Sequence, residues 1–231
     1  MRVDKMIGNT GLDTRKNIKR NAKKGALVIN GEIVKDSSVK VDPFVDEVFY
    51  MGHFVEYIEN IYLILNKPAG VLSATQDKDE TVIDLLDDFY LSYDLSIAGR
   101  LDKDTTGLIL LSTDGKFIHK ITSPNSNITK TYEVKTRDAI DDSLIEEFKN
   151  GVYIKEDDYT ARPAELEIVG EREAVVKVTE GKYHLVKRLF SNHGNEVVSL
   201  KRVAIGDLKL DPYLGEGDYR DLTDDELALF E

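Results

Sequence analysis

The feature that most constrains this chain is the stretch at residues 99–107, Gly-Arg-Leu-Asp-Lys-Asp-Thr-Thr-Gly, which runs directly into Leu-Ile-Leu-Leu at 108–111. The apolar run is short and aliphatic, and it ends at Ser-Thr-Asp-Gly, a sequence that favours a turn. We therefore predict a tight loop followed by a buried strand. A loop at the end of a buried strand is a place where a fold can hold a reactive side chain still.

The two carboxylates of this loop, Asp102 and Asp104, are open to two interpretations. Asp next to Gly and Thr is most often an ordinary turn former. However, the segment GRLDKDTTGLILLSTDG resembles the signature of the pseudouridine synthases, in the branch that modifies ribosomal RNA. In that family the Asp of an Arg-Leu-Asp triplet is the catalytic carboxylate. The resemblance implies that Asp102 is catalytic and that Arg100 contacts RNA.

Composition limits the class of protein. The chain has 231 residues, of which 41% are hydrophobic, enough for one large domain or two unequal ones with a sizeable core. We find no apolar run that could span a bilayer and no signal-peptide stretch behind the N-terminus. The absence of cysteine excludes a disulfide framework and a thiolate metal site. These features are typical of a cytoplasmic enzyme.

Charge is distributed unevenly along the chain. The net charge of −12 argues against a nucleic-acid partner, because phosphate contacts need Lys and Arg. Yet residues 1–41 contain ten basic and four acidic residues, a net charge of +6, which leaves −18 for the remainder. This asymmetry predicts a small polyanion-binding domain at 1–41 in front of a larger domain at 61–231. Between them, Asp42-Pro43, several acids and Gly52-His53 predict a linker at 42–60 with one short strand near Val45–Tyr50.

The first 41 residues predict two short helices and a hairpin. A helix near Val3–Ile7 ends at Gly11, and a second, basic helix extends from about Arg15 to Lys24. Asn30-Gly31 between two β-rich runs favours a hairpin. This pattern resembles the S-four-type RNA-binding domain, also called the alpha-L motif. It implies RNA contacts from basic residues that would otherwise form a solvated surface: Arg2, Lys5, Arg15, Lys16, Lys19, Arg20 and Lys23.

The larger domain is predicted to be α+β. Strands are expected near 61–65, 108–111, 130–134, 164–169, 174–179, 197–203 and 208–210. Helices are expected near 81–86, 116–121, 141–151 and 183–193, with a last one capped by Thr223 or Asp224. The family resemblance implies a mixed, mainly antiparallel sheet.

Three further motifs resemble the family and follow in its order. Asn66-Lys67-Pro68-Ala69-Gly70 matches the opening motif, although any Pro-Gly turn would look similar. In KTYEV, Tyr132 corresponds to the residue that lies against uracil; without the family it would be a core aromatic. In EGKYHLVKRLF, Lys187 corresponds to the cation that pairs with the catalytic Asp, with Arg188 as the neighbouring alternative. Leu185 stands where the family usually has Gln.

The implied reaction converts uridine in ribosomal RNA to pseudouridine. It needs a nucleophile, a cation that keeps the nucleophile ionised, a proton acceptor and a flipped-out base, but no cofactor. The four histidines show no metal-ligand spacing, so we expect no metal. HKITSP and KTYEV favour the branch that acts on small-subunit (16S) ribosomal RNA. We expect a monomer that acts on this RNA, either free or in a partly assembled small subunit.

Two other functions are compatible with the sequence. A non-catalytic RNA-binding assembly factor could keep the same fold, and a synthase of the same family could act on large-subunit RNA. Retention of Asp102, Tyr132 and Lys187 together favours the enzyme. A nuclease would need paired acids with a metal or a second proton donor, and Asp102 and Asp104 have neither beside them in sequence.

Overall fold

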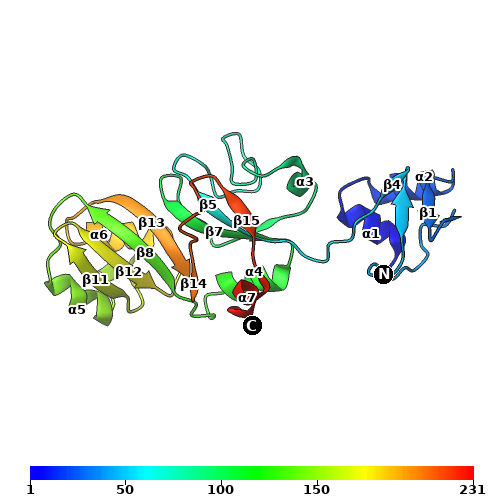
Figure 1. The fold of residues 1–231 in the computed structure, drawn as a ribbon. Coiled ribbons are helices and arrows are strands. Elements are labelled where there is room, and N and C mark those ends of the chain that lie inside the picture. Colours follow the sequence, from blue (N-terminus) through cyan, green and yellow to red (C-terminus); the bar gives the residue numbers. More distant parts are fainter. The chain divides into compact units, whose positions relative to one another are not determined.

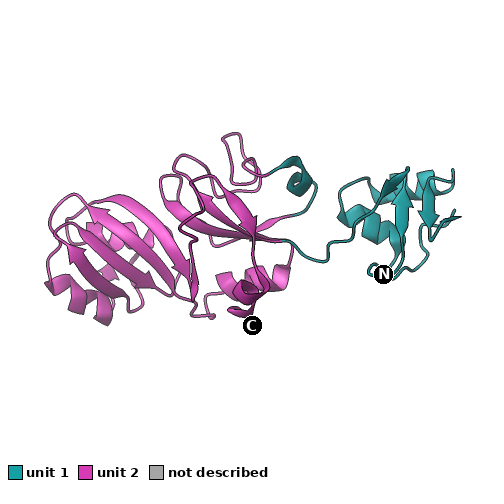
Figure 2. Ribbon diagram, in the orientation of Figure 1, with its two compact units in different colours: residues 1–61, 87–94 teal, residues 62–86, 95–231 magenta. Residues whose placement is uncertain are grey.

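A computed structural model describes the backbone of residues 1–231 and every side chain except that of Glu156. The chain forms two compact units (Figure 2). Unit 1 contains residues 1–61 and 87–94, and unit 2 contains residues 62–86 and 95–231. No helix among the described residues is long and apolar enough to cross a membrane.

Unit 1 combines short helices with a four-stranded antiparallel sheet in the order β2-β1-β3-β4. The predicted hairpin is present, and Asn30 and Gly31 at its turn both have positive φ, which these two residue types tolerate. The elements are α1 (Val3–Asn9), α2 (Arg15–Ala22), β1 (Leu27–Ile29), β2 (Glu32–Ile33), β3 (Val48–Tyr50), β4 (His53–Phe54) and α3 (Asp88–Leu91).

The segment 42–60, expected as a linker, contributes β3 and β4 to this sheet. Val48, Tyr50 and Val55 are buried with residues of α1, α2 and β1 in one apolar cluster. Asp13, which precedes α2, accepts hydrogen bonds from the side chains of Asn17 and Tyr50, which hold its pKa below the usual range. The first 41 residues therefore do not complete this core, because β1 needs β3 as its second neighbour.

Unit 2 is built on a nine-stranded sheet whose main path runs β11-β12-β8-β13-β7-β5-β15, with β14 beside β13 and β6 beside β7 (Figure 1). All pairs are antiparallel except β13 with β7, which confirms the predicted mixed, mainly antiparallel sheet. Its strands are β5 (Tyr62–Lys67), β6 (Ser96–Ala98), β7 (Thr106–Ser112), β8 (Lys130–Thr136), β11 (Glu165–Gly170), β12 (Glu173–Val178), β13 (Val197–Ile205), β14 (Leu208–Lys209) and β15 (Tyr219–Asp221). A separate hairpin pairs β9 (Tyr153–Ile154) with β10 (Tyr159–Thr160), joined by the 3-10 turn Lys155–Asp157.

The helices of unit 2 cover two apolar clusters of this sheet. Leu144 and Phe148 of α5 (Ser143–Asn150) and Leu189 and Phe190 of α6 (Leu185–Ser191) are buried with residues of β8, β11 and β12. Phe117 and Ile121 of α4 (Gly115–Thr122) pack with residues of β5 and β7 and with the end of the chain. Figure 1 shows α4 beside α7 (Asp224–Ala228).

The helix expected at 81–86 is not formed. Thr81 makes a bridge with Leu72, and its backbone N–H and hydroxyl both donate to Asp84, so the segment folds into successive turns. Asp84 and Leu86 donate their backbone N–H groups to the carbonyls of Thr81 and Ile83, three residues earlier, as in turns and not as in an α-helix. A helical turn, α3, follows instead at Asp88–Leu91.

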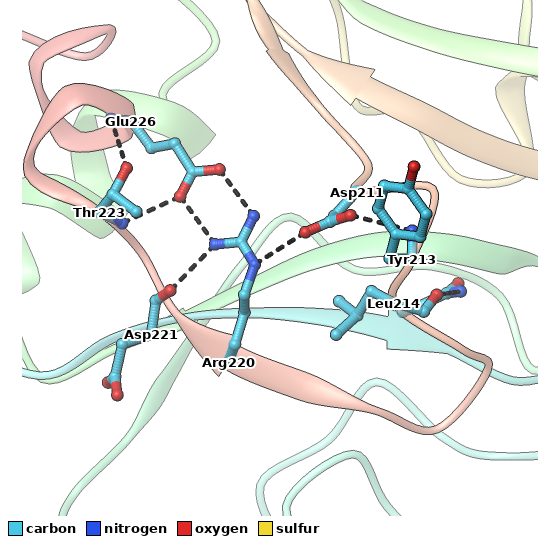
Figure 3. Close-up of polar contacts among 8 residues, drawn as sticks. Asp211, Tyr213, Leu214, Arg220, Asp221, Thr223 and Glu226 are labelled. Carbon is cyan, nitrogen blue, oxygen red and sulfur yellow. Dashed lines mark hydrogen bonds and ion pairs between the residues drawn. The ribbon is translucent and has the colours of Figure 1, made fainter.

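Arg220 of β15 holds the C-terminal segment together (Figure 3). Its guanidinium donates two hydrogen bonds of 2.8 Å to the Glu226 carboxylate and one of 3.1 Å to Asp211. Glu226 also closes a capping box with Thr223 at the start of α7. These bonds lower the pKa of Glu226 from 4.5 to about 2.

The pKa of Glu226 predicts a pH-dependent contribution to stability. Because the folded value lies below the unfolded one, the contribution is full above about pH 4.5 and is lost as pH falls toward 2. Glu226→Gln should therefore lower the free energy of unfolding by about 1–3 kcal/mol at pH 7 and by progressively less at pH 4 and 3. Urea denaturation at each pH measures this difference. Asp225→Asn, an exposed change in the same helical turn, is the control; an equal penalty for both variants would contradict the assignment.

Candidate active site

The loop at 99–105 connects β6 to β7 and is tightly held to the rest of unit 2. The hydroxyl of Ser73 donates to the Leu101 carbonyl over 2.8 Å and accepts from the Leu101 N–H over 3.0 Å. Gly107 has φ of +101°, and a Cβ there would lie 2.2 Å from the Arg202 carbonyl oxygen. Only glycine allows β13 to pass this close to the start of β7.

Two buried cations lie under this loop. Lys67, fully buried at the end of β5, donates to the carbonyls of Pro68, Lys103 and Thr105 at 3.0, 3.2 and 2.9 Å. Burial lowers the pKa of Lys67 to about 8. Arg202 of β13 is 2% exposed and donates to the carbonyls of Leu108 and Gly99 at 2.7 and 2.8 Å. Together they fix both ends of the loop.

Asp102 lies between two nitrogen-bearing side chains from the start of α6. One carboxylate oxygen is 3.4 Å from Nζ of Lys187, and the other is 3.4 Å from Nε2 of His184. His184 precedes α6 with φ of +50° and stacks on Tyr183 with ring centroids 3.7 Å apart. The side chains of Asp102 and Lys187 are 26% and 22% exposed, so solvent reaches this pair only partly.

Asp104 also contacts Lys187, and more closely than Asp102 does. The distance from Nζ of Lys187 to the Asp104 carboxylate is 2.6 Å, and this hydrogen bond holds the pKa of Asp104 below its usual range. Lys187 thus serves two carboxylates of one loop. Arg188, the neighbouring candidate, instead pairs with Asp157 at 2.7 Å.

Asp102 opens onto a cavity of about 960 Å³. Tyr132 of β8, which is partly buried, lines the same cavity opposite Arg202 in the strand register. Arg100 is exposed at the cavity wall and makes no side-chain hydrogen bond or ion pair with the other described side chains. The cavity therefore brings together four of the predicted residues: Arg100, Asp102 and Tyr132 as lining, and Lys187 behind Asp102.

Further polar residues surround this cavity. Tyr159 donates a very short hydrogen bond to Glu180, which together with burial raises the pKa of Tyr159 to about 12. Nζ of Lys182 lies 4.7 Å from the centre of the Tyr159 ring. Lys130 donates to the carbonyls of Ile121 and Ile128, and burial lowers its pKa to about 8.

The remaining predicted residues lie in unit 1 and are exposed. Arg15, Lys16, Lys19 and Arg20 belong to α2, Lys23 follows that helix and Lys5 lies on α1. Arg2 differs from the others, because its guanidinium makes a bidentate contact with Asp4 at 3.0 and 2.6 Å. Among the described residues no group of three or more His, Cys, Asp or Glu could hold a metal ion.

Sequence reasoning missed Lys67, His184 and Arg202 as site residues. Lys67 carried a signal, since a lysine two residues after the apolar run Leu-Ile-Leu at 63–65 must either leave the core or find several acceptors. His184 lies within the third motif, but the histidines of the sequence were considered only as possible metal ligands. Arg202 gave no local signal, because its partners lie 94 and 103 residues away in the chain.

Comparison with known proteins now gives the class of protein. Residues 61–199 match the model of the RNA pseudouridylate synthase family. The chain is 45% identical to an uncharacterized RNA pseudouridine synthase of Bacillus subtilis (strain 168), and the alignment covers 99% of this chain and 98% of that one. It is 41% identical to ribosomal small subunit pseudouridine synthase A of Haemophilus influenzae, with 98% of each chain covered.

A crystal structure of a pseudouridylate synthase matches with a TM-score of 0.72 and 38% identity over the whole of both chains. The chain therefore belongs to the RNA pseudouridylate synthase family. It is a pseudouridine synthase, an isomerase that modifies RNA.

The position of Lys187 predicts a large effect on activity. Lys187→Met leaves Asp102 and Asp104 without their common cation, which should favour protonation of Asp102 and lower kcat/KM by roughly 10²–10³-fold. Arg188→Met removes the adjacent cation, whose partner is Asp157, and should affect stability more than chemistry. Pseudouridine formation in the two variants, with thermal melts, measures this contrast. Comparable losses of the single-turnover rate at saturating RNA in both would argue against Lys187 as the specific partner.

Proposed function

We propose that this protein isomerises a uridine of small-subunit (16S) ribosomal RNA to pseudouridine, with Asp102 as the nucleophile. The observation that carries the proposal is the position of Asp102, at the wall of a cavity, beside Lys187, with Tyr132 lining the same space. The names of the relatives in Haemophilus influenzae and Escherichia coli (strain K12), both ribosomal small subunit pseudouridine synthase A, support the choice of RNA.

The arrangement suits an isomerisation, in which the substrate and the product contain the same atoms. The bond from ribose to N1 of uracil breaks, the base rotates, and a new bond joins the ribose to C5. C5 loses a proton while N1 gains one, and Asp102 is released unchanged. Lys187 keeps Asp102 ionised for attack. Because no electrons are gained or lost overall, the proposal requires no cofactor.

Tyr132 is proposed to stack against the flipped uracil. Its ring lines the cavity from β8, and a Tyr offers both a flat apolar face and a hydroxyl that can relay a proton. The cavity is large enough for one extruded nucleotide, because pockets for small ligands start near 300 Å³ and this one measures about 960 Å³. Arg100 and Arg188 are proposed to contact the RNA around the target base.

Unit 1 is proposed to supply much of the affinity for RNA as an S-four-type domain. Lys16 and Lys19 of its helix α2 and Lys23, which follows that helix, are exposed to solvent. Like charges on one face favour binding of a polyanion. The substrate is proposed to be ribosomal RNA, free or in an assembling small subunit, met by a monomeric protein in the cytoplasm.

The role of Asp102 is tested by its amide. Asp102→Asn keeps the size of the side chain but removes the nucleophile, so it should abolish pseudouridine formation and leave RNA affinity and melting temperature nearly unchanged. Pseudouridine mapping of ribosomal RNA from cells with the wild-type or variant protein measures both activity and the target site. Asp79→Asn, a change of an exposed carboxylate elsewhere in unit 2, is the control. Turnover by Asp102→Asn would refute the assignment, and a target in large-subunit RNA would refute the choice of substrate.

The role of unit 1 is tested by salt dependence. Reversal of Lys16, Lys19 and Lys23 to Glu should weaken RNA binding, raise KM and flatten the plot of log affinity against log salt. The slope should change by about 0.7–0.9 for each phosphate that the variant no longer neutralises. The control reverses three exposed lysines of unit 2, Lys116, Lys149 and Lys209, with the same change in net charge. Equal slopes for the wild type and both triple variants would show that α2 is only a solvated surface.

A further inference from the structure

Lys187 is shared unequally between two carboxylates of one loop. Its Nζ is 2.6 Å from Asp104 but 3.4 Å from Asp102, so the shorter contact is made to the residue outside the reaction. The side chain of Asp104 is 74% exposed, whereas that of Asp102 is 26% exposed. An exposed carboxylate has no need of a partly buried cation for its own solvation, so this contact calls for another explanation.

The other charged groups around the pair do not replace Lys187. Lys103, next in sequence to both carboxylates, points to Asp79 at 2.7 Å. Lys67 lies below the loop and interacts electrostatically with both carboxylates and with Lys187, but its three hydrogen bonds are donated to backbone carbonyls. The remaining titratable or charged groups that face Asp102 or its cavity are His184, Arg100, Lys130, Tyr132, Tyr159, Arg162, Glu180, Lys182 and Arg202.

We propose that Asp104 is a positioning residue, which draws Lys187 away from full pairing with the nucleophile and takes up part of its positive charge. This inference rests on the proposed role of Asp102. Asp104 would act on Asp102 in two ways of the same sign. It divides the charge of Lys187, and its own negative charge opposes ionisation of a second carboxylate close by. Both effects weaken the stabilisation that the Asp102 carboxylate receives from Lys187.

The sign of the expected effect follows directly. When Asp104 loses its charge, Lys187 is free to pair fully with Asp102 and the repulsion disappears, so protonation of Asp102 moves to lower pH. We expect Asp104→Asn to move the acid limb of the single-turnover rate profile down by roughly 0.5–1 pH unit. At pH 7.5, where Asp102 is ionised in both proteins, the rate should change little. A residue that only shapes the turn would leave the acid limb in place.

The experiment combines kinetics with a direct measurement on the nucleophile. Single-turnover rates with saturating RNA are taken between pH 4 and 8, and the Asp102 carboxyl is titrated by ¹³C NMR of Asp-labelled protein, with Asp102→Asn to assign its signal. Asp104→Glu keeps the charge and should resemble the wild type, whereas Asp104→Ser removes it and should resemble Asp104→Asn. Asp79→Asn is the matched control, since it removes an exposed carboxylate near the same loop without touching Lys187.

The outcomes separate this inference from the proposed function. Activity in Asp102→Asn would remove the basis of both. If Asp102→Asn is inactive and the acid limb and NMR midpoint of Asp104→Asn match those of the wild type, only the role of Asp104 is overturned. An upward shift would overturn it as well, because it would mean that Lys187 leaves Asp102 once Asp104 is replaced. A shift of the same size in Asp79→Asn would reduce the effect to general surface charge.

Discussion

The active-site loop depends on two cations that are buried beneath it and paired with no carboxylate there. Lys67 and Arg202 donate hydrogen bonds to backbone carbonyls of the segment 68–108. These carbonyls would otherwise lack partners in a tight loop. Burying a charge is costly, and the lowered pKa of Lys67, about 8, reflects that cost. The hydrogen bonds offset part of it, and as a result the loop holds Asp102 in one place.

The same arrangement explains why the contacts of Asp102, the proposed nucleophile, do not come from the cations beneath the loop. With the buried donors engaged by carbonyls, the contacts of Asp102 come from α6 and the residue before it, through Lys187 and His184. Leu185, Leu189 and Phe190 fix α6 in the apolar cluster on the other side of the helix. One short helix, α6, therefore carries both the apolar residues that pack against the sheet and the cation, Lys187, that lies beside the proposed nucleophile.

The sequence allowed much of this to be predicted where local patterns carry the information. The loop before a buried strand, the basic helix and the grouping of Asp102, Tyr132 and Lys187 at one site all follow from short segments. Long-range pairing was harder to predict. Arg202 reaches its acceptors across neighbouring strands. The change of charge after residue 41 suggested that the N-terminal core ends there, but β3, which follows that residue, is part of the same core. The turns at 81–86 were missed because a Thr followed three residues later by an acid is also the pattern of a capped helix start, and the bridge from Thr81 to Leu72 is not visible in the sequence.

The charge of the chain also needs to be considered at the level of the site. Residues 42–231 carry −18, which should repel RNA from most of the surface. The cavity differs from that average, because Arg100, Lys130, Arg162, Lys182 and Arg202 line it together with only two acids, Asp102 and Glu180. Glu180 is engaged by Tyr159, so Asp102 faces a locally positive space. An acidic surface around a positive cavity disfavours nonspecific contact and favours entry of a single phosphate-linked nucleotide, which is what a base-flipping enzyme requires.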